Sequence, residues 1–182
     1  VINHLGSKSV TRKIPGPRID AGVLLCAVAC FWALPVQAQH RHVHGEGRLS
    51  VAIEKQVVTL NLELPLDVLV GFERAPKNES EKSALRAAET RLKNAEGLWL
   101  PTPAAKCTLQ SVAVEMPDFS GGEHADVDAD YRFQCAEPAA LKSIETTLFK
   151  EFKRLYRLET QRVGPQTQGA QRLSPKNPRL SW

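Results

Sequence analysis

The segment His124–Cys135, HADVDADYRFQC, alternates apolar and polar residues more regularly than any other part of the chain. One set of alternate positions is apolar throughout and consists of Ala125, Val127, Ala129, Tyr131, Phe133 and Cys135. The other set is polar and consists of His124, Asp126, Asp128, Asp130, Arg132 and Gln134. Because successive side chains of a β-strand point to opposite faces, this pattern predicts a strand between a hydrophobic core and a polar surface. Cys135 is then expected to point into the core.

Three other segments show the same period of two. Gly47–Glu54 and Val57–Leu64 both alternate, and the two residues between them, Lys55 and Gln56, predict a tight reversal and a β-hairpin. Residues 106–116, KCTLQSVAVEM, predict a further strand that begins near Cys107. Residues 141–163 predict a strand, a short helical turn and another strand, and one last short strand is expected near the end of the chain.

One principal helix is expected between these strands. Asn78 followed by Glu81 has the spacing of a capping box, and apolar residues then recur at helical spacing from Ala84 until Gly97. The preceding segment, residues 66–76, has no assignment from its pattern. Strands grouped around one amphipathic helix predict an α+β fold with antiparallel β-sheets.

The first 38 residues differ from the rest of the chain. Basic residues precede a short apolar run from Ala21 to Leu34, and Pro35 and the small residues Val36 and Ala38 follow it. This order is typical of a secretory signal, and the run is shorter than the ~20 residues that span a bilayer. We therefore expect residues 1–38 to be a signal peptide and residues 39–182 to be a single periplasmic domain without a stable membrane anchor.

Removal of this leader changes the charge and the cysteine content. It contains four of the 24 lysines and arginines and one of the 20 acidic residues, so the formal charge falls from +4 to +1. Nucleic-acid binding then loses its compositional support, because it requires a clustered basic surface. Cys26 and Cys30 lie in the leader, whereas Cys107 and Cys135 remain. Two cysteines in an exported chain predict one disulfide, with two free buried thiols as the alternative.

Three histidines, His40, His42 and His44, follow the predicted cleavage site at every second position. If this segment is extended, His42, His44 and Glu46 share one face, with Cα atoms about 6.6 Å apart. Imidazole nitrogens at that spacing are able to converge on a zinc ion with bonds of about 2.0–2.1 Å. A polar terminus also tolerates such residues without any function, so a solvated tail is the alternative.

The polar face of the strand that opened this section offers further ligands. His124, Asp126 and Asp128 would supply nitrogen and oxygen atoms if this strand lies beside the first one. Rows of charged residues more often face water, which is the alternative here. A calcium loop beginning at Asp126 is rejected, because its sixth position requires glycine and is occupied by Tyr131. Selectivity for zinc over copper is left open by the sequence.

No motif of a known catalytic type is found in the sequence. A glycine-rich phosphate loop, an HExxH helix and a G-x-S-x-G turn are all missing. We therefore expect the protein not to be an enzyme. A small metalloenzyme is the less favoured alternative, and it would require a concave pocket around the histidines.

Several motifs, taken in their order along the chain, resemble one known family. They are HVHGEGRLSVAIE, LPLDVLVGFERAP, CTLQSVAVE, HADVDADYRFQC and LSPKNPRL. This combination resembles the ZrgA-like family, zinc-regulated periplasmic zinc-binding proteins of Gram-negative bacteria. The resemblance covers essentially all of residues 39–182, and the family's opening His-x-His-Gly falls on His42, His44 and Gly45.

This resemblance implies a periplasmic protein that binds zinc through histidines and assists its uptake beside a zinc ABC importer or the importer's binding protein. Many relatives carry a long insertion rich in histidine and acidic residues where this chain has only His124. The number of bound ions and the affinity are therefore open. The resulting hypothesis is a zinc carrier or buffer with His42 and His44 as principal ligands. His40, His124 and one carboxylate among Glu46, Asp126 and Asp128 are the other candidate ligands. The rival hypothesis is an envelope interaction module that needs no metal.

Overall fold

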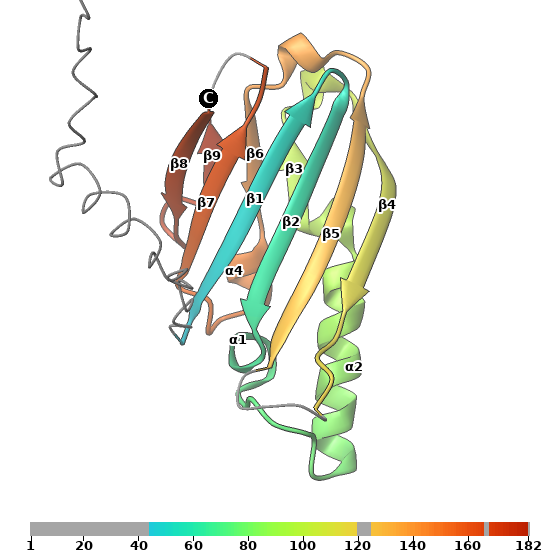
Figure 1. The fold of residues 1–182 in the computed structure, drawn as a ribbon, viewed down its shortest axis with the longest axis vertical. Coiled ribbons are helices and arrows are strands. Elements are labelled where there is room, and N and C mark those ends of the chain that lie inside the picture. Colours follow the sequence, from blue (N-terminus) through green and yellow to red (C-terminus); the bar gives the residue numbers. More distant parts are fainter. Residues whose placement is uncertain (1–43, 120–124, 166–167, 182) are drawn as a thin grey trace, which may run out of the picture. The chain divides into compact units, whose positions relative to one another are not determined.

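The computed structural model describes residues 44–119, 125–165 and 168–181. Nine strands in this part of the chain form two sheets (Figure 1). The larger sheet has the order β4-β5-β2-β1-β7-β8, and its strands are β1 (Glu46–Glu54), β2 (Val57–Pro65), β4 (Cys107–Glu115), β5 (Asp126–Cys135), β7 (Arg157–Val163) and β8 (Gln168–Leu173). The smaller sheet has the order β3-β6-β9, and its strands are β3 (Trp99–Pro101), β6 (Ser143–Thr146) and β9 (Arg179–Ser181).

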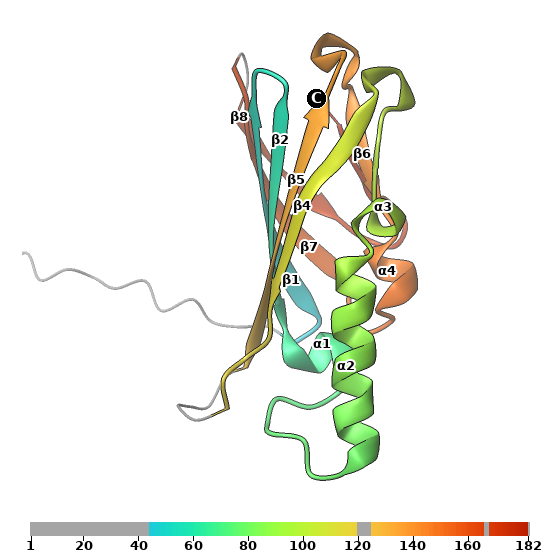
Figure 2. The ribbon, with the colours of Figure 1, turned by 90° about the vertical axis from the view of Figure 1, so that its right-hand side faces the viewer.

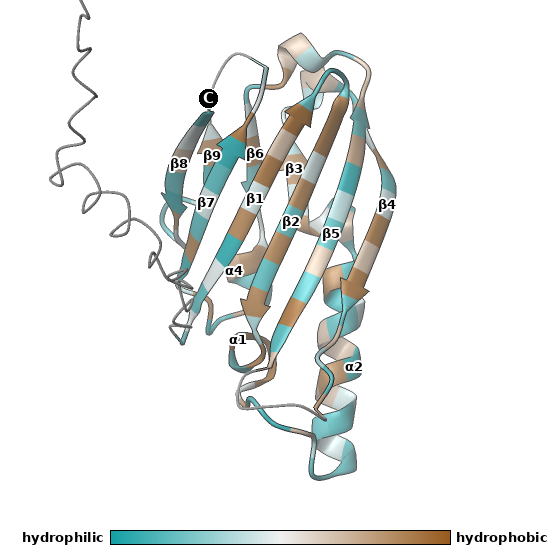
Figure 3. Ribbon diagram, viewed as in Figure 1, coloured by the Kyte–Doolittle hydropathy of each residue, from teal (hydrophilic) through white to brown (hydrophobic). Residues whose placement is uncertain are grey.

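The alternation along β5 has the structural consequence expected from the sequence. The apolar residues from Ala125 to Cys135 are all buried, whereas Asp128, Asp130 and Arg132 are exposed. Figure 3 shows the resulting bands of hydropathy along the strands of the large sheet. β5 lies between β2 and β4, so its inner face is a central part of the hydrophobic core.

The hairpin of β1 and β2 is confirmed, with Lys55 and Gln56 as the two-residue turn between the paired residues Glu54 and Val57. One pairing differs from the expected antiparallel arrangement, because β1 and β7 are parallel. Parallel neighbours require a long connection. Here the chain between β1 and β7 forms most of the remaining elements before it returns to the start of β1. The large sheet is therefore mixed.

Helix α2 (Glu79–Lys93) and the smaller sheet lie on the same side of the large sheet (Figure 2). The Tyr131 hydroxyl on β5 donates a hydrogen bond to the carbonyl oxygen of Leu92 at 3.0 Å, and the Tyr131 ring meets the ring of Trp99 edge-on at 5.6 Å. These contacts join the large sheet to the helix and to the start of β3. The opposite face of the large sheet carries the polar residues of β5.

The capping box predicted for α2 is formed only in part. The Asn78 side chain accepts a hydrogen bond from the Glu81 backbone nitrogen at 2.9 Å, as expected for an N-cap. The Glu81 carboxylate instead binds the guanidinium of Arg74 and the backbone nitrogen of Lys77. The helix ends at Lys93 rather than near Gly97, because the chain bends at Asn94 before the short helix α3 (Ala95–Leu98).

The remaining segments include one element that the pattern did not assign. Residues 66–76 contain a short helix, α1 (Leu66–Val70), which follows β2 directly and ends at Gly71 with a φ of 87°. The helical turn expected near Phe149 is α4 (Leu148–Glu151). Two short 3₁₀ turns, Pro103–Ala105 and Pro138–Ala140, precede β4 and β6. The end of the chain forms two strands, β8 and β9, instead of one.

The predicted disulfide is confirmed between Cys107 and Cys135. The two residues are direct partners in the antiparallel pairing of β4 with β5. The bond therefore joins the first residue of edge strand β4 to the last residue of β5.

Removal of this disulfide is expected to lower the free energy of unfolding, because the unfolded chain gains conformational entropy when the loop is no longer closed. Closing a loop with a sequence separation of 28 residues is worth about 3–4 kcal/mol in the chain-entropy description. The double variant Cys107→Ser/Cys135→Ser should therefore lose about that free energy of unfolding, measured in urea. Wild-type protein measured in reductant should match it, and a loss below about 1 kcal/mol would contradict the prediction.

The Arg74–Glu81 pair predicts a pH dependence at the start of α2. The hydrogen bond from Arg74, followed by that from the Lys77 backbone, lowers the pKa of Glu81 from 4.5 to about 2. A lowered pKa stabilises the fold above the unfolded value, and this contribution is lost as the pH falls from 4.5 to about 2. Glu81→Gln should destabilise the protein at pH 7, and acid titration of stability should bring variant and wild type together. A difference in unfolding free energy between the two proteins that stays constant down to pH 2 would contradict the role of the charged Glu81 carboxylate.

Candidate metal centre

His44 lies in a turn immediately before β1. The next residue, Gly45, has a φ of 78°, so the chain is not extended at this point. The condition under which His44 and Glu46 would share one face of a continuous strand is therefore not met, because the turn at Gly45 separates His44 from β1. The His44 side chain is 76% exposed.

Two carboxylates face the ring of His44. His44 Nδ1 lies 3.0 Å from Asp67 Oδ2 and 3.6 Å from Glu73 Oε1. One ligand atom from each of the three residues lies within 4.8 Å of the other two. Asp67 and Glu73 are mostly buried, with side-chain exposures of 18% and 20%. The exposed imidazole of His44 thus faces two carboxylates that are largely shielded from water.

The topology explains why these residues meet. β1 and β2 are antiparallel, so the start of β1 lies beside the end of β2. Helix α1 begins directly after β2 and carries Asp67 in its first turn. The left-handed conformation of Gly71 ends the helix, and Glu73 follows two residues later. The site therefore combines residues that precede the hairpin with residues that follow it.

The charge balance of this cluster differs from that of several other carboxylates. Glu46, Glu63 and Glu81 are paired with arginines. In the part of the chain that the structure describes, neither Asp67 nor Glu73 forms an ion pair with a lysine or arginine, and both face Nδ1 of His44. The guanidinium of Arg154 lies near Gly71, since a Cβ on that glycine would be 2.9 Å from an Arg154 nitrogen.

Asp67 has one further unusual feature. Its Oδ1 atom is buried and has no hydrogen-bond partner among the described residues. A buried carboxylate oxygen without a partner is costly, and such atoms in folded proteins are commonly satisfied by a proton, a water or an ion. This orphaned oxygen belongs to a residue whose other oxygen already faces His44.

His44 Nδ1 and Asp67 Oδ2 are within hydrogen-bond distance of each other, and the separations in the cluster are also compatible with a metal ion. Ligand atoms about 2.1 Å from a tetrahedral ion lie about 3.4 Å from one another. The observed separations of 3.0 and 3.6 Å bracket this value. One imidazole nitrogen and two carboxylates are ordinary ligands of zinc, and three protein ligands leave a fourth position open. The cluster is thus able to hold a divalent cation without enclosing it.

The other predicted ligands have different locations. His40, His42 and His124 lie outside the described residues. Glu46 is bound to Arg157, whose Nη1 is 2.6 Å from Glu46 Oε1, and to the hydroxyl of Tyr156. Asp126 and Asp128 lie on the polar face of β5. None of these three carboxylates belongs to the cluster around His44, and their role as ligands remains a prediction.

Asp67 and Glu73 are the residues that the sequence interpretation missed. Both lie within LPLDVLVGFERAP, a segment quoted for the family resemblance but left without a structural assignment. Their spacing matches no ligand motif, because Gly71 turns the chain between them. The available signal was the presence of two acidic residues in a mostly apolar connection after a hairpin.

A row of carboxylates crosses the polar face of the large sheet. Asp128 on β5 is the direct partner of Glu63 on β2 and of Glu115 on β4. Desolvation raises the pKa of Asp128, and repulsion by Glu63 and by neighbouring carboxylates raises it further. Like charges directly opposite one another destabilise a sheet. This row is a polar surface of the fold that carries an electrostatic cost.

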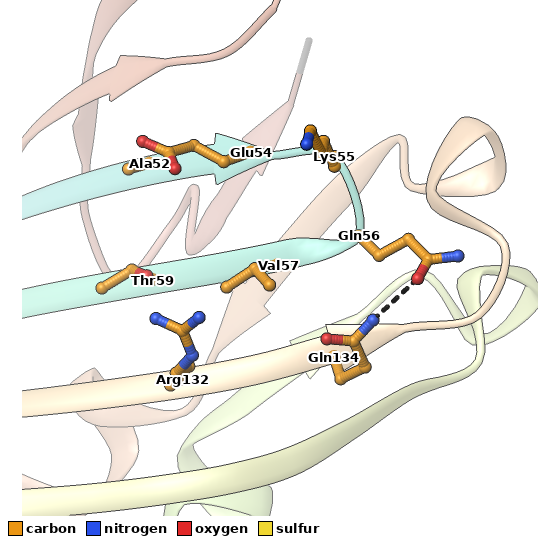
Figure 4. Close-up of a pocket in the computed structure, with 8 residues that line it drawn as sticks. All are labelled: Ala52, Glu54, Lys55, Gln56, Val57, Thr59, Arg132 and Gln134. Carbon is orange, nitrogen blue, oxygen red and sulfur yellow. Dashed lines mark hydrogen bonds between the residues drawn. The ribbon is translucent and has the colours of Figure 1, made fainter.

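The concavity shown in Figure 4 lies elsewhere. It surrounds the turn between β1 and β2, where Gln134 donates a hydrogen bond to the side-chain oxygen of Gln56 at 2.9 Å. Lys55 and Arg132 give it a mixed polar lining together with Glu54. It is at the opposite end of β1 from His44, so this concavity does not contain the candidate metal centre.

The structure combines an α+β fold with a surface group of side chains of the types that ligate metals. Residues 41–182 match the sequence profile of the ZrgA family of zinc uptake proteins, and the chain belongs to this family. The resemblance seen in its motifs is therefore confirmed, and family membership indicates a role in zinc uptake. A search of curated proteins finds no match to the chain. No helix in the described part is long and apolar enough to cross a membrane.

The carboxylate row gives a prediction about stability. Asp128→Asn removes one of the opposed charges and should raise the free energy of unfolding at pH 7 by about 0.5 kcal/mol. Because the folded state raises the pKa of Asp128, the destabilisation is present above that pKa and disappears as the pH falls below it. Urea unfolding at pH 7 and pH 3 measures both effects. A less stable variant at pH 7 would contradict the assignment of repulsion.

Proposed function

We propose that the protein binds Zn²⁺ at His44, Asp67 and Glu73 and buffers or delivers it in the periplasm. The observation that carries this proposal is a pair of largely buried carboxylates that face an exposed histidine nitrogen and form no ion pair with a lysine or arginine among the described residues. Two carboxylates and one neutral imidazole leave a net negative site, and a divalent cation compensates that charge. The orphaned Oδ1 of Asp67 supports the same interpretation.

The exposure of the site suits exchange better than permanent storage. Structural zinc sites are usually closed by four protein ligands, whereas sites that exchange ligands keep one position open. His44 is 76% exposed, so an incoming ligand has access to an ion held there. A recipient protein is then able to add its own ligand before the carboxylates release the ion. Acid favours release, because zinc binds the deprotonated nitrogen of imidazole.

Neighbouring histidines are proposed as additional ligands. His42 precedes His44 by two residues, a maximum chain length of about 7 Å. His124 precedes Ala125, whose carbonyl oxygen accepts a hydrogen bond from the Leu66 nitrogen at 2.8 Å. Leu66 is adjacent to Asp67, so Ala125, the residue after His124, lies at the same end of the sheet as Asp67. His42 and His124 are therefore the first candidates for the fourth position, and His40 is the next.

The proposed location and partners follow from the leader and the family. A signal-like segment at residues 1–38 and a disulfide between Cys107 and Cys135 both suit an oxidising compartment. A zinc importer or its binding protein is the proposed recipient, because the family is described by zinc uptake. We propose a carrier without catalytic activity, in which zinc is the cargo.

The proposal is tested by titrating Zn²⁺ into metal-stripped protein that begins at Gln39, using isothermal calorimetry. Wild type should bind about one equivalent with a dissociation constant below about 10 μM, which corresponds to about 6.8 kcal/mol. His44→Ala and Glu73→Gln should each weaken binding at least about tenfold, because each removes one ligand. Titration of Cu²⁺ and Mn²⁺ under the same conditions measures selectivity.

The matched control for Glu73→Gln is Glu54→Gln. Glu54 is an exposed carboxylate at the far end of β1, so its replacement changes the net charge equally without touching the site. This control should bind zinc as wild type does. Equal affinities for Glu73→Gln and wild type would overturn the proposed site. Binding weaker than about 10 μM by wild type would favour the interaction module that needs no metal.

A further inference from the structure

Tyr156 is a large side chain at the surface whose position is fixed by three contacts near His44. It lies immediately before β7, and it is 47% exposed. Its backbone nitrogen donates a hydrogen bond to the carbonyl oxygen of Gly45 at 2.9 Å. Its hydroxyl donates to Glu46 Oε1 at 3.2 Å. Both partners are within two residues of His44.

The Tyr156 ring also packs against the backbone of Gly45. A Cβ atom placed on Gly45 would lie 2.2 Å from Cε1 and 2.5 Å from Cδ1 of the ring. Gly45 is buried and has a φ of 78°, a conformation that glycine adopts without strain. The ring therefore occupies the space where any other residue at position 45 would place its side chain. Ring and turn form one packed unit.

Glu46 connects this unit to the sheet. Its Oε1 accepts the hydrogen bond from Tyr156 and also lies 2.6 Å from Arg157 Nη1. Because β1 and β7 are parallel, Glu46 and Arg157 are register partners at the starts of the two strands. The contacts of Tyr156 thus attach the turn that carries His44 to the first paired residues of β1 and β7.

From these contacts we propose that Tyr156 is a positioning residue of the metal centre. The inference rests on the proposed function and adds a residue that does not itself bind the ion. The His44 side chain is largely exposed, so the conformation of the turn determines where its ring lies. With the Tyr156 ring against Gly45, His44 Nδ1 is held 3.0 Å from Asp67 and 3.6 Å from Glu73 before zinc arrives. Preorganised ligands bind more tightly, because binding does not have to order them.

The test compares three variants of the protein that begins at Gln39. Tyr156→Ala removes the ring, and Tyr156→Phe keeps the ring but removes the hydroxyl. Val163→Ala is the matched control, because Val163 is an exposed apolar residue, at 60%, and is the last residue of β7, at the end of the strand far from Tyr156. Each variant is measured for zinc affinity by calorimetry and for free energy of unfolding without metal in urea.

Tyr156→Ala should weaken zinc binding about tenfold, as outer residues that orient metal ligands commonly do. Tyr156→Phe should restore the affinity to within about twofold of wild type, since the ring contact with Gly45 is kept. Val163→Ala should bind as wild type does. NMR of the His44 ring should show more motion in metal-free Tyr156→Ala than in wild type, a readout that a general loss of stability would not produce.

A double variant tests the contact directly. Gly45→Ala should weaken binding, because its methyl group meets the ring and its backbone is strained at a positive φ. In the Tyr156→Ala background the same change should cost less, because the clash with the ring is gone and only the positive φ and the contact with the Arg154 carbonyl oxygen at 3.0 Å remain. Equal zinc affinity in Tyr156→Ala and wild type would overturn the positioning role, as would equal costs of Gly45→Ala in both backgrounds. If Glu73→Gln also binds normally, the proposed metal site itself has failed.

Discussion

The position of β1 between an antiparallel and a parallel neighbour is the constraint on which the rest of the structure depends. β2 pairs with β1 in the antiparallel sense, and β7 pairs with it in the parallel sense. The end of β2 and the start of β7 therefore both lie beside the start of β1. The buried residues Leu49 and Val51 fix this register, because a slip by one residue would turn them to the polar face. Three segments distant in the sequence meet at one end of β1 as a result.

The distribution of charge gives that end of the sheet its chemical character. Arginines pair with Glu46, Glu63 and Glu81, and these pairs are part of the ordinary surface of the fold. The opposed carboxylates around Asp128 are a cost of the polar sheet face. Asp67 and Glu73 are about as buried as Glu46 and Glu81, but they face a histidine nitrogen instead of a guanidinium. Burial makes their charges harder to leave without a counterion.

The sequence predicted the elements that local patterns determine. The alternation along β5, the β1–β2 hairpin, the N-cap of α2 and the cysteine pair all follow from residues close together or from a simple count. The parallel partner of β1 was missed, because strand neighbours separated by a long connection leave no local pattern.

Only the part of the candidate site that depends on local sequence was predictable. The histidine spacing near His44 was visible in the sequence, but the interpretation assumed a continuous strand. Gly45 adopts a left-handed conformation instead, and the ring of Tyr156 packs against it. The carboxylates that face His44 come from a helix of five residues and the turn after it, a segment too short for helical periodicity to identify. Their proximity depends on tertiary structure.

The parallel pairing of β1 with β7 also sets the order in which the cluster around His44 is assembled as the chain folds. β1 is among the first segments of the domain to emerge, whereas β7 lies in its last third. Contacts between segments so far apart form late in folding, because a large loop must close first. The turn that carries His44 gains its contacts with Tyr156 and Arg157 only when that later part of the chain is present. An unfinished chain therefore lacks the arrangement of His44, Asp67 and Glu73, and this cluster is a property of the completed fold.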